Sequence, residues 1–155
     1  MNPSDILPKA PLPRVLIGFS AAFLSTLTFH ELGFLLVNLT GLGTFTLFNM
    51  RPTVPLGVPL LISLSFWGGL WGILYVFIVE RFPKTIHPWV AGFLFAILLP
   101  TLFGWTVVAS IRGQPMFAGF DGLRLLLITF INGLWGVGLP ILCVLLARTG
   151  LFKSA

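Results

Sequence analysis

Charged residues are scarce in this chain. Lys, Arg, Asp and Glu make up 8% of its 155 residues, and 57% are hydrophobic, whereas about a quarter of the residues in an ordinary soluble domain are charged. A water-soluble fold of this length could not bury so much apolar surface. The composition therefore excludes a conventional soluble domain and predicts a protein embedded in a lipid bilayer.

Cysteine and acidic residues are also few. The one cysteine, Cys143, lies inside an apolar run, so there is no disulfide framework and no CxxC site, and we interpret it as a small buried apolar residue. The four acidic residues form no carboxylate pair within an apolar run, and no GxSxG motif or phosphate-binding loop is present. We therefore expect no catalytic residue, no metal site and no cofactor.

The basic residues are scattered rather than clustered. Nine Lys and Arg residues give a net charge of +5, but they stand singly at the ends of apolar runs, whereas a nucleic-acid-binding surface gathers them on one face. We therefore expect no nucleic-acid partner. Lys and Arg accumulate in short cytoplasmic loops. Six of the nine fall on one side, against Arg51, Arg112 and Arg124 on the other, which predicts that both termini are cytoplasmic.

Long apolar runs are abundant. A helix needs about 20 apolar residues to cross the hydrocarbon layer of ~30 Å, and four runs reach that length, at about residues 15–39, 58–79, 89–111 and 123–147. The first run is longer than the apolar core of a cleaved signal peptide, about 7–15 residues. We predict an all-α fold, a bundle of four transmembrane helices over residues 15–148, with a cytoplasmic N-terminal arm at residues 1–14 and a cytoplasmic tail at residues 149–155.

We expect two segments outside these runs to adopt different conformations. The N-terminal arm is rich in proline, which favours an extended or frayed conformation. Residues 41–59, called the linker below, are too apolar for a simple water-exposed loop. We expect the linker to fold back onto the mouth of the bundle. A re-entrant loop would require protein or trapped water to satisfy its backbone.

Small residues recur at helical spacing in three of the apolar runs. Such stripes let the backbones of neighbouring transmembrane helices approach closely. Pro100 and Pro140 are predicted to kink the third and fourth helices. The positions predicted to mediate helix packing are Gly68, Gly72, Gly92, Ala96, Gly104, Gly133 and Gly136.

The apolar runs also resemble one another. The sequence Gly-Leu-Trp-Gly at residues 69–72 recurs at residues 133–136, and Gly-Phe at residues 18–19 recurs at residues 92–93. Two helices per unit would give a parallel 2+2 internal repeat with a pseudo-two-fold axis along the membrane normal. Chance recurrence of Gly and Trp in apolar helices is the alternative explanation.

His30 and Glu31 are adjacent ionisable residues within the first apolar run. An ionised carboxylate near the centre of a span costs ~2.5–3.5 kcal/mol on insertion scales, so Glu31 must be paired, hydrated or protonated. Three arrangements would satisfy it: a hydrogen bond from Asn132 or Trp135, an ion pair with Arg51, or protonation. Adjacent helical residues point about 100° apart, so the two side chains would line neighbouring walls of one crevice.

Residues 30–34 match the first part of the HExxH motif of zinc proteases. That chemistry needs a second histidine one turn later, so that both imidazoles face the metal. Phe34 occupies that position, and the other histidine, His87, lies in a loop on the predicted opposite side. A zinc hydrolase is therefore excluded.

Three segments carry a resemblance to known proteins. Residues 27–31 (LTFHE), 48–52 (FNMRP) and 66–72 (FWGGLWG) resemble those of small bacterial four-span membrane proteins without an assigned function. The resemblance covers nearly the whole chain. It implies the four-span architecture and fits a multi-pass protein of the bacterial inner membrane, and it transfers no activity.

Two functions fit these observations. The first is a non-enzymatic accessory or scaffolding subunit that packs against a second copy or a larger membrane complex, indicated by the small-residue faces. The second is a small oligomeric channel or carrier in which His30, Glu31, Arg51 and Asn132 line a route for protons or a small solute. In both cases the lipid bilayer is the surrounding medium.

Overall fold

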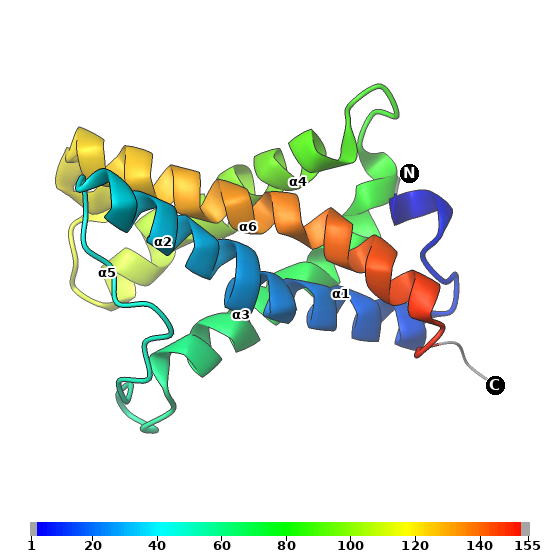
Figure 1. Ribbon diagram of the computed structural model, residues 1–155, viewed down its shortest axis with the longest axis horizontal. Coiled ribbons are helices and arrows are strands. Elements are labelled where there is room, and N and C mark those ends of the chain that lie inside the picture. Colours follow the sequence, from blue (N-terminus) through cyan, green and yellow to red (C-terminus); the bar gives the residue numbers. More distant parts are fainter. Residues whose placement is uncertain (1–2, 153–155) are drawn as a thin grey trace.

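The computed structural model describes residues 3–152, and these contain helices and no strand. Four helices are long and apolar enough to cross a membrane: Pro11–Thr40, Leu60–Arg81, Pro88–Ile111 and Gly122–Thr149. The prediction of an all-α bundle of four transmembrane helices is therefore confirmed, and the protein is a multi-pass membrane protein. The first and last helices bring the two ends of the described chain to the same end of the bundle (Figure 1).

The first span is one continuous helix made of three parts. It comprises α1 (Pro11–Ser25), a π-helical segment (Thr26–His30) and α2 (Glu31–Thr40). It begins at Pro11, four residues before the predicted start, because proline suits the first helical turn, where its missing N–H is not needed. Gly41 ends it in the left-handed conformation that favours glycine.

The other spans differ in regularity. The second consists of α3 (Leu60–Ile78) and a 3₁₀ turn (Val79–Arg81), and the fourth is α6 (Gly122–Thr149), which contains Pro140 without interruption. The third span is broken into α4 (Pro88–Ala96), two π-helical segments (Ile97–Thr101 and Gly104–Val108) and α5 (Ala109–Ile111). Pro100 lies inside the first of these segments. The third span is therefore the least regular of the four.

The N-terminal segment is packed rather than extended. Pro3–Asp5 form a 3₁₀ turn that contacts α6 and the turn Val79–Arg81, and Leu7 is buried in the main core cluster. The prediction of an extended or frayed arm over residues 1–14 is therefore wrong for the part from residue 3, because an apolar side chain anchors it to the bundle. Residues 1–2, and residues 153–155 of the predicted tail, lie outside the described part of the chain.

The first span and α6 form the central pair of the bundle. α1 packs on α3, α4 packs on α6, and α1 and α6 pack on each other. Near the terminal end, Arg14 fixes α1 to α3: its side chain donates hydrogen bonds to the Val76 carbonyl oxygen at 2.8 Å and to Glu80 Oε1 at 2.6 Å. The second and third spans pack on this central pair and meet each other through aromatic rings.

Matching glycines mark the two crossing points. A Cβ on either Gly18 or Gly72 would overlap the carbonyl oxygen of the other residue, and the same holds for Gly92 and Gly136. Only glycine fits at such a contact, because the two helix backbones touch and leave no room for a Cβ atom. The predicted packing roles of Gly72, Gly92 and Gly136 therefore agree with the geometry, and Ala96 lies against Gly136 in the second crossing.

The two crossings also have equivalent aromatic neighbours. The Phe19 ring covers Gly69, and the Phe93 ring covers Gly133. These residues are the ones that the internal repeat relates, 74 positions apart in the first helix of each unit and 64 positions apart in the second. The α1–α3 and α4–α6 pairs are therefore built from equivalent contacts, as a 2+2 repeat predicts.

Candidate functional site: a cavity between the second and third spans

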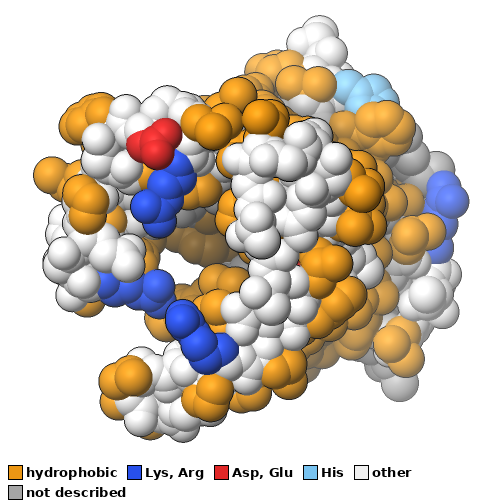
Figure 2. All heavy atoms as spheres, turned by 60° about the vertical axis from the view of Figure 1, so that its left-hand side comes forward, with side chains coloured by type: hydrophobic (Ala, Val, Ile, Leu, Met, Phe, Trp, Pro, Cys, Tyr) orange, Lys and Arg blue, Asp and Glu red, His pale blue; other side chains and the backbone are white. Residues whose placement is uncertain are grey.

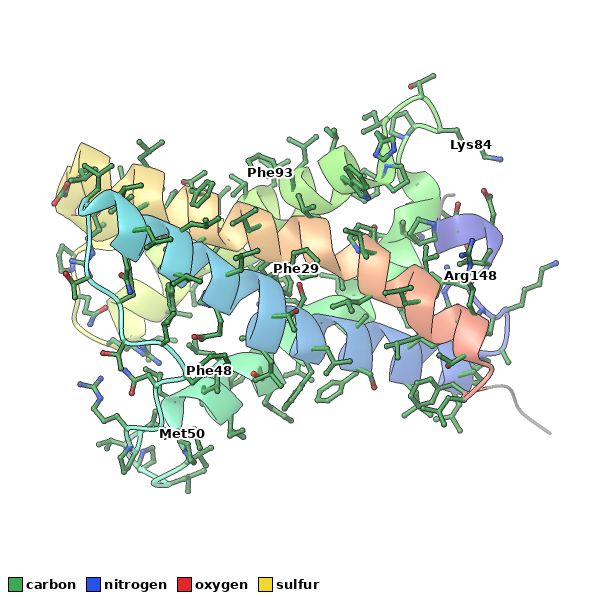
Figure 3. The ribbon with its side chains drawn as sticks, in the orientation of Figure 1. Phe29, Phe48, Met50, Lys84, Phe93 and Arg148 are labelled. Carbon is green, nitrogen blue, oxygen red and sulfur yellow. The ribbon has the colours of Figure 1, made fainter. Side chains whose placement is uncertain are left out.

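Glu31 is attached to the linker. Its Oε2 accepts a hydrogen bond from the Phe48 backbone N–H at 2.7 Å, and the residue is only 4% exposed. Phe48 has a left-handed φ of 47° and lies where the linker approaches the bundle (Figure 3). The predicted pairings of Glu31 with Asn132 or Trp135, and with Arg51, are therefore wrong, because a backbone donor from the linker reaches the carboxylate.

Two further contacts hold the linker against α2. The Asn38 side-chain amide donates to the Phe45 carbonyl oxygen at 2.8 Å and accepts from the Phe45 N–H at 2.7 Å. The rings of Phe34 and Phe45 stack with their centroids 4.7 Å apart. The linker therefore folds back onto the bundle, as expected from its apolar composition.

A cavity of about 520 Å³ lies between α3 and the third span. Its volume is within the range of about 300–1,000 Å³ of small-molecule sites, which often lie between helices of a bundle. Figure 2 views the molecule from the end that carries the linker, and shows a hollow with Lys or Arg side chains around it. The cavity is lined by Thr26, His30, Leu64, Trp67, Gly68, Trp71, Pro100, Phe103, Gly104, Val108, Ile111, Arg112, Asn132 and Trp135.

The polar groups on the inner wall come from the two central helices. Trp135 Nε1 donates to the Ala22 carbonyl oxygen and to Thr26 Oγ1, both at 3.1 Å. Asn132 Nδ2 donates to Thr101 Oγ1 at 2.9 Å. These bonds fix the orientation of the indole and the amide, so the polar part of the wall is preorganised.

His30 is different, because one of its ring nitrogens is unsatisfied. Nδ1 is buried and has no hydrogen-bond partner among residues 3–152, and the Phe34 ring packs edge-on against the imidazole at 4.5 Å. A buried polar atom without a partner costs about 1–3 kcal/mol. Among the cavity-lining side chains, His30 therefore has unused hydrogen-bonding capacity.

The cavity contains only part of the predicted pathway. His30 and Asn132 line it, but Glu31 and Arg51 do not. The adjacent residues His30 and Glu31 serve different parts of the molecule, and the expectation that both line one crevice is wrong. Sequence reasoning also missed Arg112, whose position at the end of the third apolar run was the only available signal.

Two of the glycines predicted to mediate helix packing line the cavity, and their surroundings differ. Gly68 on α3 and Gly104 on the third span both line it. A Cβ on Gly104 would meet no atom within 4 Å, so this residue, predicted to mediate helix packing, borders open space instead. A Cβ on Gly68 would meet Thr26 Oγ1 at 2.8 Å, so Gly68 contacts the first span.

The opening carries positive charge. Arg112 lines the cavity, and the linker, which contains Arg51, and the start of α6, which contains Arg124, lie at the same end of the bundle (Figure 1). Within residues 3–152, none of these three side chains forms an ion pair, and no group of three His, Cys, Asp or Glu side chains could hold a metal ion.

Comparisons with protein-family models, curated protein sequences and solved structures find no match for this chain.

Proposed function

We propose that this multi-pass membrane protein is a non-enzymatic carrier that binds a small solute in the cavity between α3 and the third span. The supporting observation is a cavity of about 520 Å³ with mostly apolar walls, oriented polar groups on one side and an unsatisfied histidine nitrogen. Small-molecule sites combine an apolar lining with a few fixed polar groups in this way.

Irregular helix geometry beside the cavity supports a carrier role. The third span contributes Pro100 and Gly104 to the wall, and each lies in a π-helical segment. The first span contributes Thr26 and His30, which begin and end its own π-helical segment. Such segments occur frequently at functional sites, and a span broken by them bends more readily than an uninterrupted α-helix.

The accessory-subunit hypothesis has less support. It was motivated by small-residue faces available to a partner helix, and within the described residues most of the predicted glycines are already covered by this chain's own helices. Gly104 is the exception, and it faces the cavity. The cavity is therefore the feature on which the proposed function depends.

We also propose an inner bacterial membrane, with the termini in the cytoplasm and the cavity opening on the outer side. The resemblance to bacterial four-span proteins and the six-to-three distribution of Lys and Arg support this orientation. Lys84 and Arg148 lie at the terminal end of the bundle (Figure 3), away from the linker.

The test fills the cavity without disturbing the fold. Gly104→Leu places a side chain in the cavity, and Gly122→Leu is the matched control, because a Cβ on either residue would meet nothing within 4 Å and Gly122 does not line the cavity. Native mass spectrometry of protein extracted in lipid nanodiscs is expected to detect a bound small molecule in wild type and Gly122→Leu, but not in Gly104→Leu. Equal retention by Gly104→Leu, or an empty wild-type protein, would contradict the proposal.

A further inference from the structure

We infer that the solute is a single-chain amphiphile with an anionic head, its head held at Arg112 and its chain lying in the cavity. This inference rests on the proposed function and adds the chemical class of the ligand. It follows from the depth of the cavity, the exposure of its walls and the charge at its opening.

The depth of the cavity matches one leaflet of a bilayer. Its wall on the third span runs from Pro100 to Arg112, twelve positions apart, which at about 1.5 Å per helical residue is roughly 18 Å. The hydrocarbon layer is ~30 Å thick. The cavity therefore extends from the end of the bundle to slightly beyond mid-membrane, the span that one acyl chain occupies.

The outer wall of the cavity faces the region where lipid would lie. Trp67 is 60% exposed, Phe103 is 44% exposed and Ile111 is 79% exposed, although all three line the cavity. In a four-helix protein within a bilayer, such apolar surfaces contact acyl chains. A chain could therefore enter between α3 and the third span from the side, which a compact polar solute would not do.

The opening is suited to an anionic head. Arg112 lines the cavity and its side chain has no acidic partner among residues 3–152. Asp121 is the acidic residue in the adjoining loop, and its Oδ1 accepts from the Arg124 backbone N–H at 3.1 Å. A guanidinium binds carboxylate or phosphate through two parallel hydrogen bonds. Arg112 is therefore a free cation at the depth where a bound amphiphile places its head.

The experiment separates the head from the chain. Wild-type protein in nanodiscs of zwitterionic lipid is titrated with a fatty acid that carries a brominated chain, and quenching of the cavity tryptophans (Trp67, Trp71 and Trp135) reports binding. A monoacylglycerol with the same brominated chain, whose head has no anionic group, tests the charge of the head. Acetate, added as a competitor, tests whether a free anion suffices.

The expected result is saturable quenching by the fatty acid, with at least about tenfold tighter binding than the uncharged monoacylglycerol, because charge-assisted hydrogen bonds are stronger than bonds between neutral groups. Arg112→Gln should remove most of this preference. Arg124→Gln should retain it, because Arg124 lies at the same end but does not line this cavity. Acetate should not compete.

Failure of the inference and failure of the proposed function give different results. Equal binding of both amphiphiles, unchanged in Arg112→Gln but lost in Gly104→Leu, would overturn the anionic head and leave the cavity as a binding site. Competition by acetate would overturn the role of the chain. Unchanged fatty-acid quenching in Gly104→Leu would overturn the proposed function as well.

Discussion

Two helix interfaces that the internal repeat makes equivalent differ in how closely they pack. The α1–α6 interface is closed, whereas its counterpart between α3 and the third span contains the cavity. At the closed interface, Ala21 and Leu139 are both fully buried. Their counterparts at offsets of 74 and 64 residues are Phe95 and Tyr75, whose rings meet edge-on at 5.2 Å. Both rings belong to the buried core, and neither lines the cavity.

Neighbouring positions of the two interfaces also differ in their side chains. The Phe29 ring covers Gly138 at the closed interface, and Phe29 and Phe93 lie on opposite sides of α6 (Figure 3). At offsets of 74 and 64 residues the corresponding positions of the open interface are Phe103 and Leu74, so a leucine stands there in place of the glycine. Ser25 Oγ donates to the Trp135 carbonyl oxygen at 2.7 Å. Ser25-Thr26-Leu27 resembles Pro100-Thr101-Leu102, and Pro100, the counterpart of Ser25, has no hydroxyl.

The equivalent tryptophans show the consequence. Trp135 is buried and its indole N–H is bound to the first span. Both tryptophans line the cavity, but the contact of Trp71 is a ring contact, edge-on against Phe103 at 5.5 Å, and not a hydrogen bond to another span. The comparison teaches that two interfaces built from equivalent helix pairs differ in side-chain size at a few positions, and that the cavity lies in the interface with the larger side chains.

The largest expected effect comes from blocking a glycine crossing. In Gly136→Leu the new side chain would overlap the Gly92 backbone, so we expect a loss of about 3 kcal/mol or more in the free energy of unfolding, the upper end for overpacking. Denaturation in mixed detergent micelles measures it. Gly104→Leu should lose almost nothing, and equal losses in the two variants would contradict the assignment of Gly104 to open space.

A leucine at position 138 would give the closed interface the larger side chain that the open interface has at position 74. Gly138→Leu introduces the residue found at position 74 and would displace the Phe29 ring. We expect a loss of about 2 kcal/mol in the free energy of unfolding and faster labelling of the buried Cys143 by a maleimide. Unchanged labelling would mean that side-chain volume at this position does not control the closure of α1 against α6.

Substitutions of Glu31 test whether His30 and Glu31, which are adjacent in the first span, belong to different parts of the molecule, His30 to the cavity and Glu31 to the contact with the linker. Glu31→Ala leaves the Phe48 N–H without its acceptor, so we expect about 1–2 kcal/mol less stability for the folded-back linker. Hydrogen exchange over residues 41–59 measures this. Glu31→Gln, which keeps an acceptor oxygen, should have a smaller effect. Loss of cavity binding in Glu31→Gln, with unchanged linker exchange, would place Glu31 in the solute site instead.

The smallest expected effect is the difference in stability between variants of the two equivalent tryptophans, Trp135 and Trp71. Trp135→Phe loses the indole donor to Ala22 and Thr26, and we expect about 1 kcal/mol lower stability in the same micelle titration. Trp71→Phe should change stability less, because Trp71 makes a ring contact at the cavity wall. A larger loss for Trp71→Phe would show that the open interface contributes more to stability than its packing indicates.

Sequence reasoning predicted part of the candidate site. His30 and Asn132 were identified because polar residues inside an apolar run stand out, and both line the cavity. Glu31 was identified for the same reason, but its neighbour in space is Phe48, seventeen residues away in a segment whose path depends on tertiary contacts. Gly104 has the same spacing signal as Gly92 and a different environment, because spacing defines the face of a helix and not what lies opposite it.

The amino-acid sequence by itself determined the four spans and their internal repeat, because the length of an apolar run and the spacing of small residues are local properties of the chain. It also contained the residues that differ between the two halves. Only the tertiary structure decided which of those differences leaves a space, since a cavity depends on the summed volumes of side chains from four helices. The partner of a buried carboxylate is decided in the same way, by which donor the folded chain brings within hydrogen-bond distance.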